Sequence, residues 1–240
     1  MNTVNVLGYK VCDTDYRELL IDLKGVIKSK ERVSIISLNP NKVMLAEKNQ
    51  MIKDILMGTK YLIPDGTGIL WASRREEKEL KNRITGISLF EEICLNSFEI
   101  GAKIFLLGST ALVVEKTQKA LKEKYPAIEI SGYMDGYFED NDKTLDLINS
   151  SGANLLAVAM GSPKQELWIQ ENAKQLENIN IFIGLGGAFD VISGQMKRAP
   201  KWMIKLGLEW LYRIARQPIA RIKNLVTIFR FCKVVLTRKK

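Results

Sequence analysis

Short apolar runs that alternate with helical patterns constrain the fold of this chain more than any other feature. Six such runs have the length and composition of buried strands, and they lie at residues 33–38, 61–63, 103–107, 128–133, 155–160 and 179–183. Strands that alternate with helices predict a parallel sheet covered by helices on both faces. The sequence therefore predicts an α/β fold, a Rossmann-like parallel-sheet sandwich.

Helical periodicity indicates where the covering helices lie. We expect helices over residues 16–30, 43–57, 69–75, 88–100, 111–124, 143–150 and 165–176, and a strand or hairpin over residues 4–11. Pro200 suits the first turn of one further helix, which would run to about Arg216. The apolar residues of that helix recur at helical spacing and would share one side: Trp202, Met203, Leu206, Trp210, Leu211 and Ile214.

Charge divides the chain into two parts. The net charge is +9, yet the first 200 residues are close to neutral. From residue 201 onward, 11 Lys and Arg stand against a single acid, Glu209. A basic tail favours a polyanionic partner, either nucleic acid or an anionic membrane surface. We therefore predict an α/β core at residues 1–195 and a basic helical C-terminal appendage at residues 196–240.

Composition excludes several kinds of site. The chain has no histidine, which excludes histidine-activated nucleophiles and histidine metal ligands. Its three cysteines are widely spaced and form no Cys-x-x-Cys pair, so neither a disulfide framework nor a zinc site is indicated. The N-terminus lacks a signal-peptide pattern, and no run approaches the roughly 18 continuous apolar residues of a spanning helix. We expect a cytoplasmic protein.

Three predicted strands end in glycine-bearing loops. The glycines are Gly108, Gly161 and those of residues 184–187. In open α/β sheets, ligands bind at such carboxyl-end loops. None of the loops matches Gly-x-Gly-x-x-Gly or a P-loop, and the missing glycine fingerprint disfavours a Rossmann-type dehydrogenase or methyltransferase. Asp190 and the basic pair Lys197–Arg198 follow the last loop, so the segment suits an anionic, hydroxyl-rich ligand.

Two motifs carry a resemblance to a known family. Residues 161–168 read Gly-Ser-Pro-Lys-Gln-Glu-Leu-Trp, and Arg-Ala-Pro at 198–200 precedes Gly-Leu-Glu-Trp-Leu-Tyr-Arg at 207–213. The chain resembles the WecG/TagA/CpsF family of bacterial glycosyltransferases from about Asn39 to Arg221. The resemblance implies inverting transfer of N-acetylmannosamine from UDP to the N-acetylglucosamine of an undecaprenyl-diphosphate acceptor, in wall teichoic acid or related surface-polysaccharide assembly. Some members transfer the uronic acid or another hexose.

The candidate catalytic residues follow predicted strands. Asp65 lies between Pro64 and Gly66, where an aspartate is common turn chemistry, or it is a general base at the mouth of the sheet. The resemblance favours the base. It also implies catalytic positions at Asn39, Ser37, Gln165 and Arg83. Ser37 keeps the hydroxyl of the threonine found there in many members. From pattern alone, the neighbours Gln165 and Glu166 equally suit compensation of a helix dipole.

The resemblance implies a second set of residues that hold UDP. Tyr137 would flank the uracil, although a turn aromatic can also simply pack. Asp190 would accept from the ribose hydroxyls. Arginine is permanently charged and bidentate toward phosphate, so arginines of the appendage would stabilise the departing diphosphate. The whole UDP set is Tyr137, Gly108, Gly161, Gly186, Asp190, Arg213, Arg216 and Arg221.

Metal use is not expected. Many sugar transferases hold a divalent ion with Asp-x-Asp, and the chain has this pattern at residues 13–15 and 140–142. The first lies ahead of the core strands and suits a helix N-cap. The second lies in a polar loop, where two carboxylates are not a coordination set. We expect a transferase without a metal or other cofactor.

The tail after Pro218 has the pattern of a basic amphipathic helix. Its predicted apolar face consists of Ile222, Leu225, Val226, Phe229, Cys232 and Leu236. Such a helix suits the inner face of the cell membrane, where a lipid-linked acceptor lies. Alternatively, it packs on its own domain or on a partner subunit. Binding to nucleic acid would need exposed aromatics as stacking platforms, which this pattern does not favour. The oligomeric state stays open.

Overall fold

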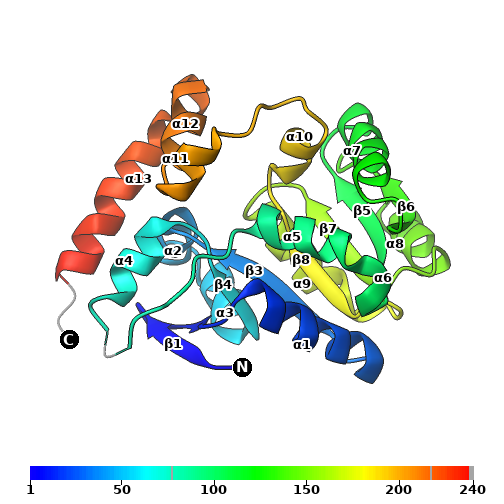
Figure 1. Cartoon of the computed structure of the whole chain (residues 1–240), viewed down its shortest axis with the longest axis horizontal. Helices are drawn as coiled ribbons and strands as arrows, with labels where there is room; N and C mark the ends of the chain where they lie inside the picture. Colours follow the sequence, from blue (N-terminus) through cyan, green and yellow to red (C-terminus); the bar gives the residue numbers. More distant parts are fainter. Residues whose placement is uncertain (77, 217, 238–240) are drawn as a thin grey trace.

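A computed structural model of the protein describes residues 1–76, 78–216 and 218–237, with the backbone but not the side chains of residues 201, 205, 213, 216 and 218–224. A parallel sheet of six strands runs through it in the order β4-β3-β8-β7-β5-β6, and β1 and β2 form a separate antiparallel hairpin (Figure 1). The strands are β1 Thr3–Val6, β2 Tyr9–Cys12, β3 Val33–Leu38, β4 Tyr61–Pro64, β5 Lys103–Gly108, β6 Glu129–Met134, β7 Leu155–Ala159 and β8 Ile181–Gly184. The predicted Rossmann-like α/β fold is confirmed.

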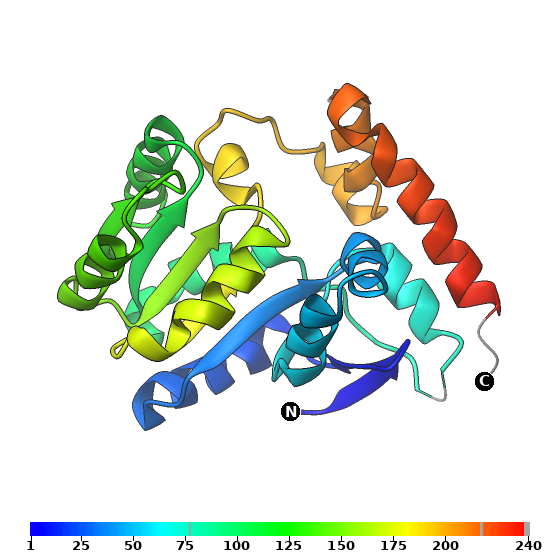
Figure 2. The ribbon, with the colours of Figure 1, turned by 180° about the vertical axis from the view of Figure 1, so that it is seen from behind.

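Helices cover both faces of the sheet. They are α1 Tyr16–Ser29, α2 Pro40–Ala46, α3 Gln50–Gly58, α4 Thr67–Ser73, α5 Gly86–Leu95, α6 Ser97–Ile100, α7 Ala111–Lys124, α8 Asn141–Ser150, α9 Lys164–Asn172, α10 Ala188–Ile192, α11 Lys201–Lys205, α12 Glu209–Arg216 and α13 Pro218–Thr237, with a 3-10 turn at Ala173–Gln175. Figure 1 looks onto the face that carries α1, α5 and α7, and Figure 2 onto the face that carries α3, α8 and α9.

Alternating strand residues build the core on the two faces. In β5, Ile104 and Leu106 pack with α1, α5 and α7, whereas Phe105 and Leu107 pack with α8 and α9. Parallel strands between two helical layers are buried on both sides, which is why β5, β7 and β8 are almost continuously apolar. This arrangement leaves the carboxyl ends of the strands free to form a site.

Three helices that the sequence predicted as continuous are interrupted in the structure. The helix expected over 43–57 is interrupted between α2 and α3, because the Asn49 side chain accepts a hydrogen bond from the Ile52 N–H at 3.2 Å and starts a new helix. The helix expected over 88–100 is split at Asn96. The helix expected from Pro200 to Arg216 breaks at Gly207, whose φ of 72° is left-handed. Gly207 also packs closely on Thr67, so a longer side chain has no room there.

The C-terminal helix α13 packs on α2 with a face that the sequence did not predict. Phe231 and Val235 are buried in one cluster with Leu38 of β3. Within the predicted apolar face, Val226, Phe229 and Leu236 are exposed. One side of α13 therefore packs on its own core, as in the alternative considered above, and a second apolar side faces solvent.

Candidate active site

A cavity of about 420 Å³ lies at the carboxyl ends of β3, β4 and β8, with the C-terminal helices forming one wall. Polar residues from the strand ends and apolar residues from α12 and α13 line it together. The predicted site residues on its lining are Ser37, Asn39, Asp65, Arg83, Gln165 and Gly186. The C-terminal helices contribute Trp210, Ile214, Ile228, Phe231 and Cys232. The cavity thus combines a polar floor with an apolar wall.

Parallel pairing places Asn39 and Asp65 together. Leu38 pairs with Pro64 in the register of β3 and β4, so the next residue of each strand is Asn39 or Asp65. The Asp65 N–H donates to the Leu38 carbonyl at 2.8 Å, which fixes the turn that carries the carboxylate. The side-chain amide oxygen of Asn39, Oδ1, caps α2 by accepting from the Lys42 N–H at 3.0 Å. Its amide nitrogen is the group left for a ligand.

The N-terminus of α5 closes the other side of Ser37. A Cβ added to Gly86 would lie 2.7 Å from the Ser37 hydroxyl oxygen, so glycine is what lets this helix approach the strand end. Arg83 lies just before α5, and its guanidinium donates to the Ile204 carbonyl at 3.0 Å. Arg83 therefore lines the cavity, as predicted, and also connects the core to α11, which was not predicted.

A buried ion pair adjoins the cavity, and its lysine, Lys42, is on the cavity lining. The Lys42 ammonium is 2.7 Å from Glu166 Oε1, and the two side chains are 7% and 2% exposed. Burial acts to raise the pKa of the Glu166 carboxyl, but the Lys42 charge and hydrogen bond outweigh it and hold that pKa below its usual value. Glu166 does lie in the first turn of α9, yet it mainly neutralises a buried lysine.

This ion pair also orients Gln165. The Gln165 amide nitrogen donates to Glu166 Oε1 at 2.8 Å, and the amide oxygen accepts from the Gly186 N–H at 2.9 Å. A Cβ on Gly184 would lie 2.5 Å from that amide nitrogen, so the strand end passes directly over it. Both polar atoms of Gln165 are thereby oriented, and the glycine loop after β8 is tied to the start of α9.

The predicted nucleotide residues lie at the neighbouring strand ends. Gly108, Gly161, Asp190 and Tyr137 are not on the cavity lining. Asp190 accepts a hydrogen bond from the Ser109 hydroxyl at 3.4 Å, which links α10 to the end of β5. Tyr137 is 75% exposed, so it does not simply pack. Its ring centroid is 5.9 Å from the Lys164 ammonium.

Three further predicted residues cannot be placed. The side chains of Arg213, Arg216 and Arg221 lie outside the described part of the structure, although their backbones belong to α12 and α13. Their predicted role at the diphosphate stays a prediction.

Both Asp-x-Asp segments serve as helix caps. Asp15 accepts from the Glu18 N–H at 2.9 Å, and Asp140 accepts from the Lys143 N–H at 3.0 Å. Among the residues that the structure describes, no group of three or more Cys, Asp or Glu side chains is arranged to hold a metal ion. The first cap was expected from the sequence, and the second was not.

Comparisons with known proteins identify the family. The sequence model of the glycosyl transferase WecG/TagA/CpsF family matches residues 4–240. The chain belongs to this family. It is 36% identical over 217 residues to the N-acetylglucosaminyldiphosphoundecaprenol N-acetyl-beta-D-mannosaminyltransferase of Bacillus subtilis (strain 168), which covers 90% of this chain and 84% of the relative. The protein of the same name from Staphylococcus aureus (strain NCTC 8325 / PS 47) is 34% identical over 243 residues, 99% and 94% of the two chains.

Membership of the WecG/TagA/CpsF family confirms the resemblance and the enzyme class, and the protein is a glycosyltransferase. The rival interpretations were a nucleic-acid-binding protein and a Rossmann-type dehydrogenase or methyltransferase, and the match to a glycosyltransferase family supports neither. In the appendage, the aromatic side chains of Trp202 and Phe229 are exposed. Both side chains are therefore accessible, and burial does not prevent them from stacking on bases.

Sequence reasoning missed several residues of this glycosyltransferase site. Lys42 and Glu166 were not expected to pair, because no local pattern links a residue after β3 to one after β7. Trp210 was assigned to the apolar side of a helix, and Phe231 was not singled out, yet both line the cavity. The proximity of α13 to the site results from its packing on α2, and this tertiary contact leaves no pattern in the sequence.

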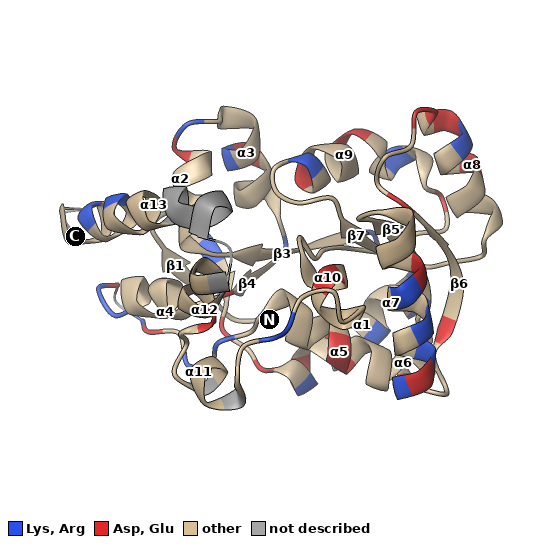
Figure 3. Ribbon diagram, turned by 90° about the horizontal axis from the view of Figure 1, so that it is seen from above, with Lys and Arg blue, Asp and Glu red and all other residues tan. Residues whose placement is uncertain are grey.

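The described part of α13 carries positive charge but no negative charge. In Figure 3, the described part of α13 shows Lys and Arg but no Asp or Glu, whereas α7 carries both signs. Among the described residues, none of the helices has the length and hydropathy required to cross a bilayer.

Proposed function

We propose that this glycosyltransferase moves N-acetylmannosamine from UDP-N-acetylmannosamine to the N-acetylglucosamine of an undecaprenyl-diphosphate acceptor, with inversion at the anomeric carbon. The observation that carries the proposal is the mixed cavity, whose lining includes Asp65 and Asn39 together with Trp210 and Phe231. A sugar hydroxyl suits the polar floor, and the lipid-linked side of an acceptor suits the apolar wall. The two relatives bear the name of this activity.

In this proposal Asp65 is the general base. The Asp65 carboxylate takes the proton from the acceptor hydroxyl as the hydroxyl oxygen attacks the anomeric carbon of the donor. The bond from that carbon to the UDP oxygen breaks on the opposite face, and UDP leaves with the bonding electrons. Asn39 and Ser37 hold the acceptor, and Gln165, already oriented by Glu166 and the Gly186 N–H, holds the donor sugar.

We assign the nucleotide to the strand ends beside the cavity. Gly108 and Gly161 allow the backbone to approach the ligand, Asp190 binds the ribose, and Tyr137 contacts the uracil face. Gly186 lies on the cavity lining and connects this region to the sugar. The arginines at 213, 216 and 221 neutralise the diphosphate, and we propose that no metal ion is needed.

We further propose that the enzyme works at the inner face of the cell membrane. Exposed Trp202, Leu206 and Phe229 and the basic α13 supply the apolar and cationic contacts that such binding needs. Arg230 and Lys233 are exposed and lie outside the cavity. Replacing both with glutamate should weaken sedimentation with anionic vesicles and spare transfer to a soluble acceptor analogue. Unchanged vesicle binding would contradict this placement.

The test of the reaction is transfer from UDP-N-acetylmannosamine to a short-chain analogue of the lipid acceptor. Asp65→Asn should lower turnover by about 10² or more and leave the affinity for UDP nearly unchanged, because the base acts on the acceptor. Asp146→Asn, on the exposed side of α8, is the matched control and should be silent. Full turnover of Asp65→Asn would remove Asp65 from the mechanism. Transfer only from another UDP-hexose would correct the donor.

A further inference from the structure

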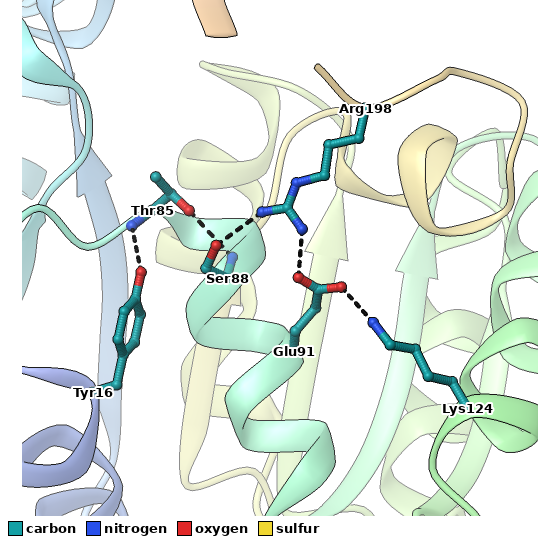
Figure 4. A network of polar contacts seen from close by, with 6 residues as sticks. All are labelled: Tyr16, Thr85, Ser88, Glu91, Lys124 and Arg198. Carbon is teal, nitrogen blue, oxygen red and sulfur yellow. Dashed lines mark hydrogen bonds and ion pairs between the residues drawn. The ribbon is translucent and has the colours of Figure 1, made fainter. Parts of the chain in front are cut away.

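One arginine anchors the segment that joins the core to the C-terminal helices. Residues 193–200 leave α10 and cross to α11 (Figure 1). The Arg198 guanidinium donates through Nη1 to Glu91 Oε2 at 2.6 Å and through Nη2 to the Ser88 hydroxyl at 2.9 Å (Figure 4). Ser88 and Glu91 lie three residues apart on α5, so both bonds fall on one face of this helix. Arg198 therefore joins two elements 107 residues apart in the sequence.

The Arg198 contact is part of a charged cluster. The Lys124 ammonium of α7 lies 2.7 Å from Glu91 Oε1, so one carboxylate holds two cations (Figure 4). Burial acts to raise the pKa of Glu91, but the hydrogen bonds from Lys124 and Arg198 outweigh it and hold the pKa below its usual value. Glu91 is consequently charged at neutral pH, and Arg198 is committed to it rather than free to bind an anionic ligand.

On the core side, Arg198 binds α5, the helix whose first turn lines the active site. Thr85 caps α5 by accepting from the Ser88 N–H at 3.2 Å, so Ser88 stands one turn from the helix start. Gly86 and Ile87, in that first turn, line the cavity. The hydroxyl of Tyr16 accepts from the Thr85 N–H at 3.4 Å and holds the turn from the other side. Arg198 thus binds a helix whose beginning is already fixed.

The other end of the anchor leads to the apolar wall of the site. Ala199 is buried, and α11 begins two residues after it, at Lys201. The Ile204 carbonyl accepts from Arg83, and α12 then supplies Trp210 and Ile214 to the cavity. The position of these two side chains therefore depends on where the chain between α10 and α11 is held.

We propose that Arg198 is a positioning residue for the transfer reaction: its bonds to Glu91 and Ser88 place the wall formed by α12 against the acceptor. The inference rests on the proposed function, in which this wall contacts the lipid-linked acceptor. The residues assigned to the uracil and the ribose, at the ends of β5 to β7, lie outside this wall, whereas Arg213 and Arg216, assigned to the diphosphate, belong to α12. Loss of Arg198 should therefore weaken binding of the acceptor and leave binding of uridine unchanged.

The experiment compares Arg198→Met with Lys124→Met in the full-length protein. Both variants remove one cation from Glu91, but only Arg198→Met releases the segment to α11. Because displacements of about 1 Å in a reaction site can cost on the order of 10²-fold, we expect Arg198→Met to raise the KM for the acceptor analogue about tenfold. The Kd for uridine, which lacks the diphosphate, should change less than about twofold, and Lys124→Met should behave as wild type. Arg198→Lys reaches one partner at a time and should be intermediate.

Two further measurements separate positioning from general stability. Glu91→Ala should reproduce the acceptor KM of Arg198→Met, and the double variant should be no worse than either single one, because the residues act as a pair. Amide hydrogen exchange should accelerate in residues 195–216 of Arg198→Met and stay unchanged in the sheet. An equal loss of affinity for uridine and for the acceptor, or equal effects of Arg198→Met and Lys124→Met, would overturn the proposal. Unchanged exchange would overturn it whether or not the transfer reaction is the one proposed above.

Discussion

The buried pair of Lys42 and Glu166 makes a sharp prediction about stability. Glu166→Gln keeps the size of the side chain and an oxygen that can accept from Gln165, but it leaves the Lys42 ammonium buried without a countercharge. Breaking a buried pair by removing one partner costs about 3–5 kcal/mol in the free energy of unfolding. For a chain of this size, each kcal/mol corresponds to about 2–4 °C in Tm. We expect Glu166→Gln to lower Tm by about 10 °C.

The chain offers a matched control. Lys60 and Glu31 are also 2.7 Å apart, but their side chains are 55% and 46% exposed. An exposed pair contributes at most about 1 kcal/mol, so Glu31→Gln should lower Tm by no more than about 4 °C. Distance is thus held constant and burial is the variable.

Thermal unfolding followed by circular dichroism at pH 7 measures both variants. Replacing both partners, as in Lys42→Met with Glu166→Gln, removes the unpaired charge and should recover about half of the lost Tm or more. The reasoning is refuted if Glu166→Gln and Glu31→Gln lower Tm equally, or if the double variant is less stable than Glu166→Gln.

Three further predictions concern pH, metal and packing. The pKa of folded Glu166 is depressed, so its contribution to stability is complete above about pH 4.3 and is lost as the pH falls through the folded value. Urea unfolding of the wild type should weaken more steeply below that pH than unfolding of Lys42→Met with Glu166→Gln, and parallel curves would contradict this. Transfer should persist in EDTA; loss that Mg²⁺ or Mn²⁺ restores would implicate a bound metal. Phe231→Ala should lower the free energy of unfolding in urea by about 3–5 kcal/mol, and Phe229→Ala, at an exposed position, by less than about 0.5 kcal/mol. Similar losses for the two variants would contradict the packing of α13 through Phe231.

Sequence patterns predicted the elements whose boundaries are set locally. The strand at 33–38 and the helix at 111–124 have the expected bounds, because an apolar run and a Thr110 cap define them. The helix breaks at Asn49 and Gly207 were missed, because apolar periodicity continues across both. Gly207 has a left-handed φ of 72° and packs closely on Thr67, and no local pattern records that packing.

The site was predictable wherever it follows strand ends. Asn39 and Asp65 could be expected together because parallel strands bring their carboxyl ends to one edge, and the cavity contains both. Glu91 and Arg198 could not be paired from the sequence, since long-range ion pairs leave no periodic signal. The face of α13 was misjudged for a similar reason: the helix has apolar residues on more than one side, and only the packing of Phe231 on α2 shows which side is covered.

The place of β8 in the sheet has a consequence for how the protein is made. Of the described strands it is the last to leave the ribosome, yet it lies between β3 and β7. Until Ile181 can pair with both Val33 and Leu155, β4-β3 and β7-β5-β6 are separate half-sheets with unpaired edges. The halves carry different parts of the site, Asp65 on one and Gln165 on the other. A nascent chain that ends before about residue 184 therefore exposes two unpaired strand edges, which favour aggregation. Insertion of the four-residue β8 closes both edges and brings the two halves of the site together.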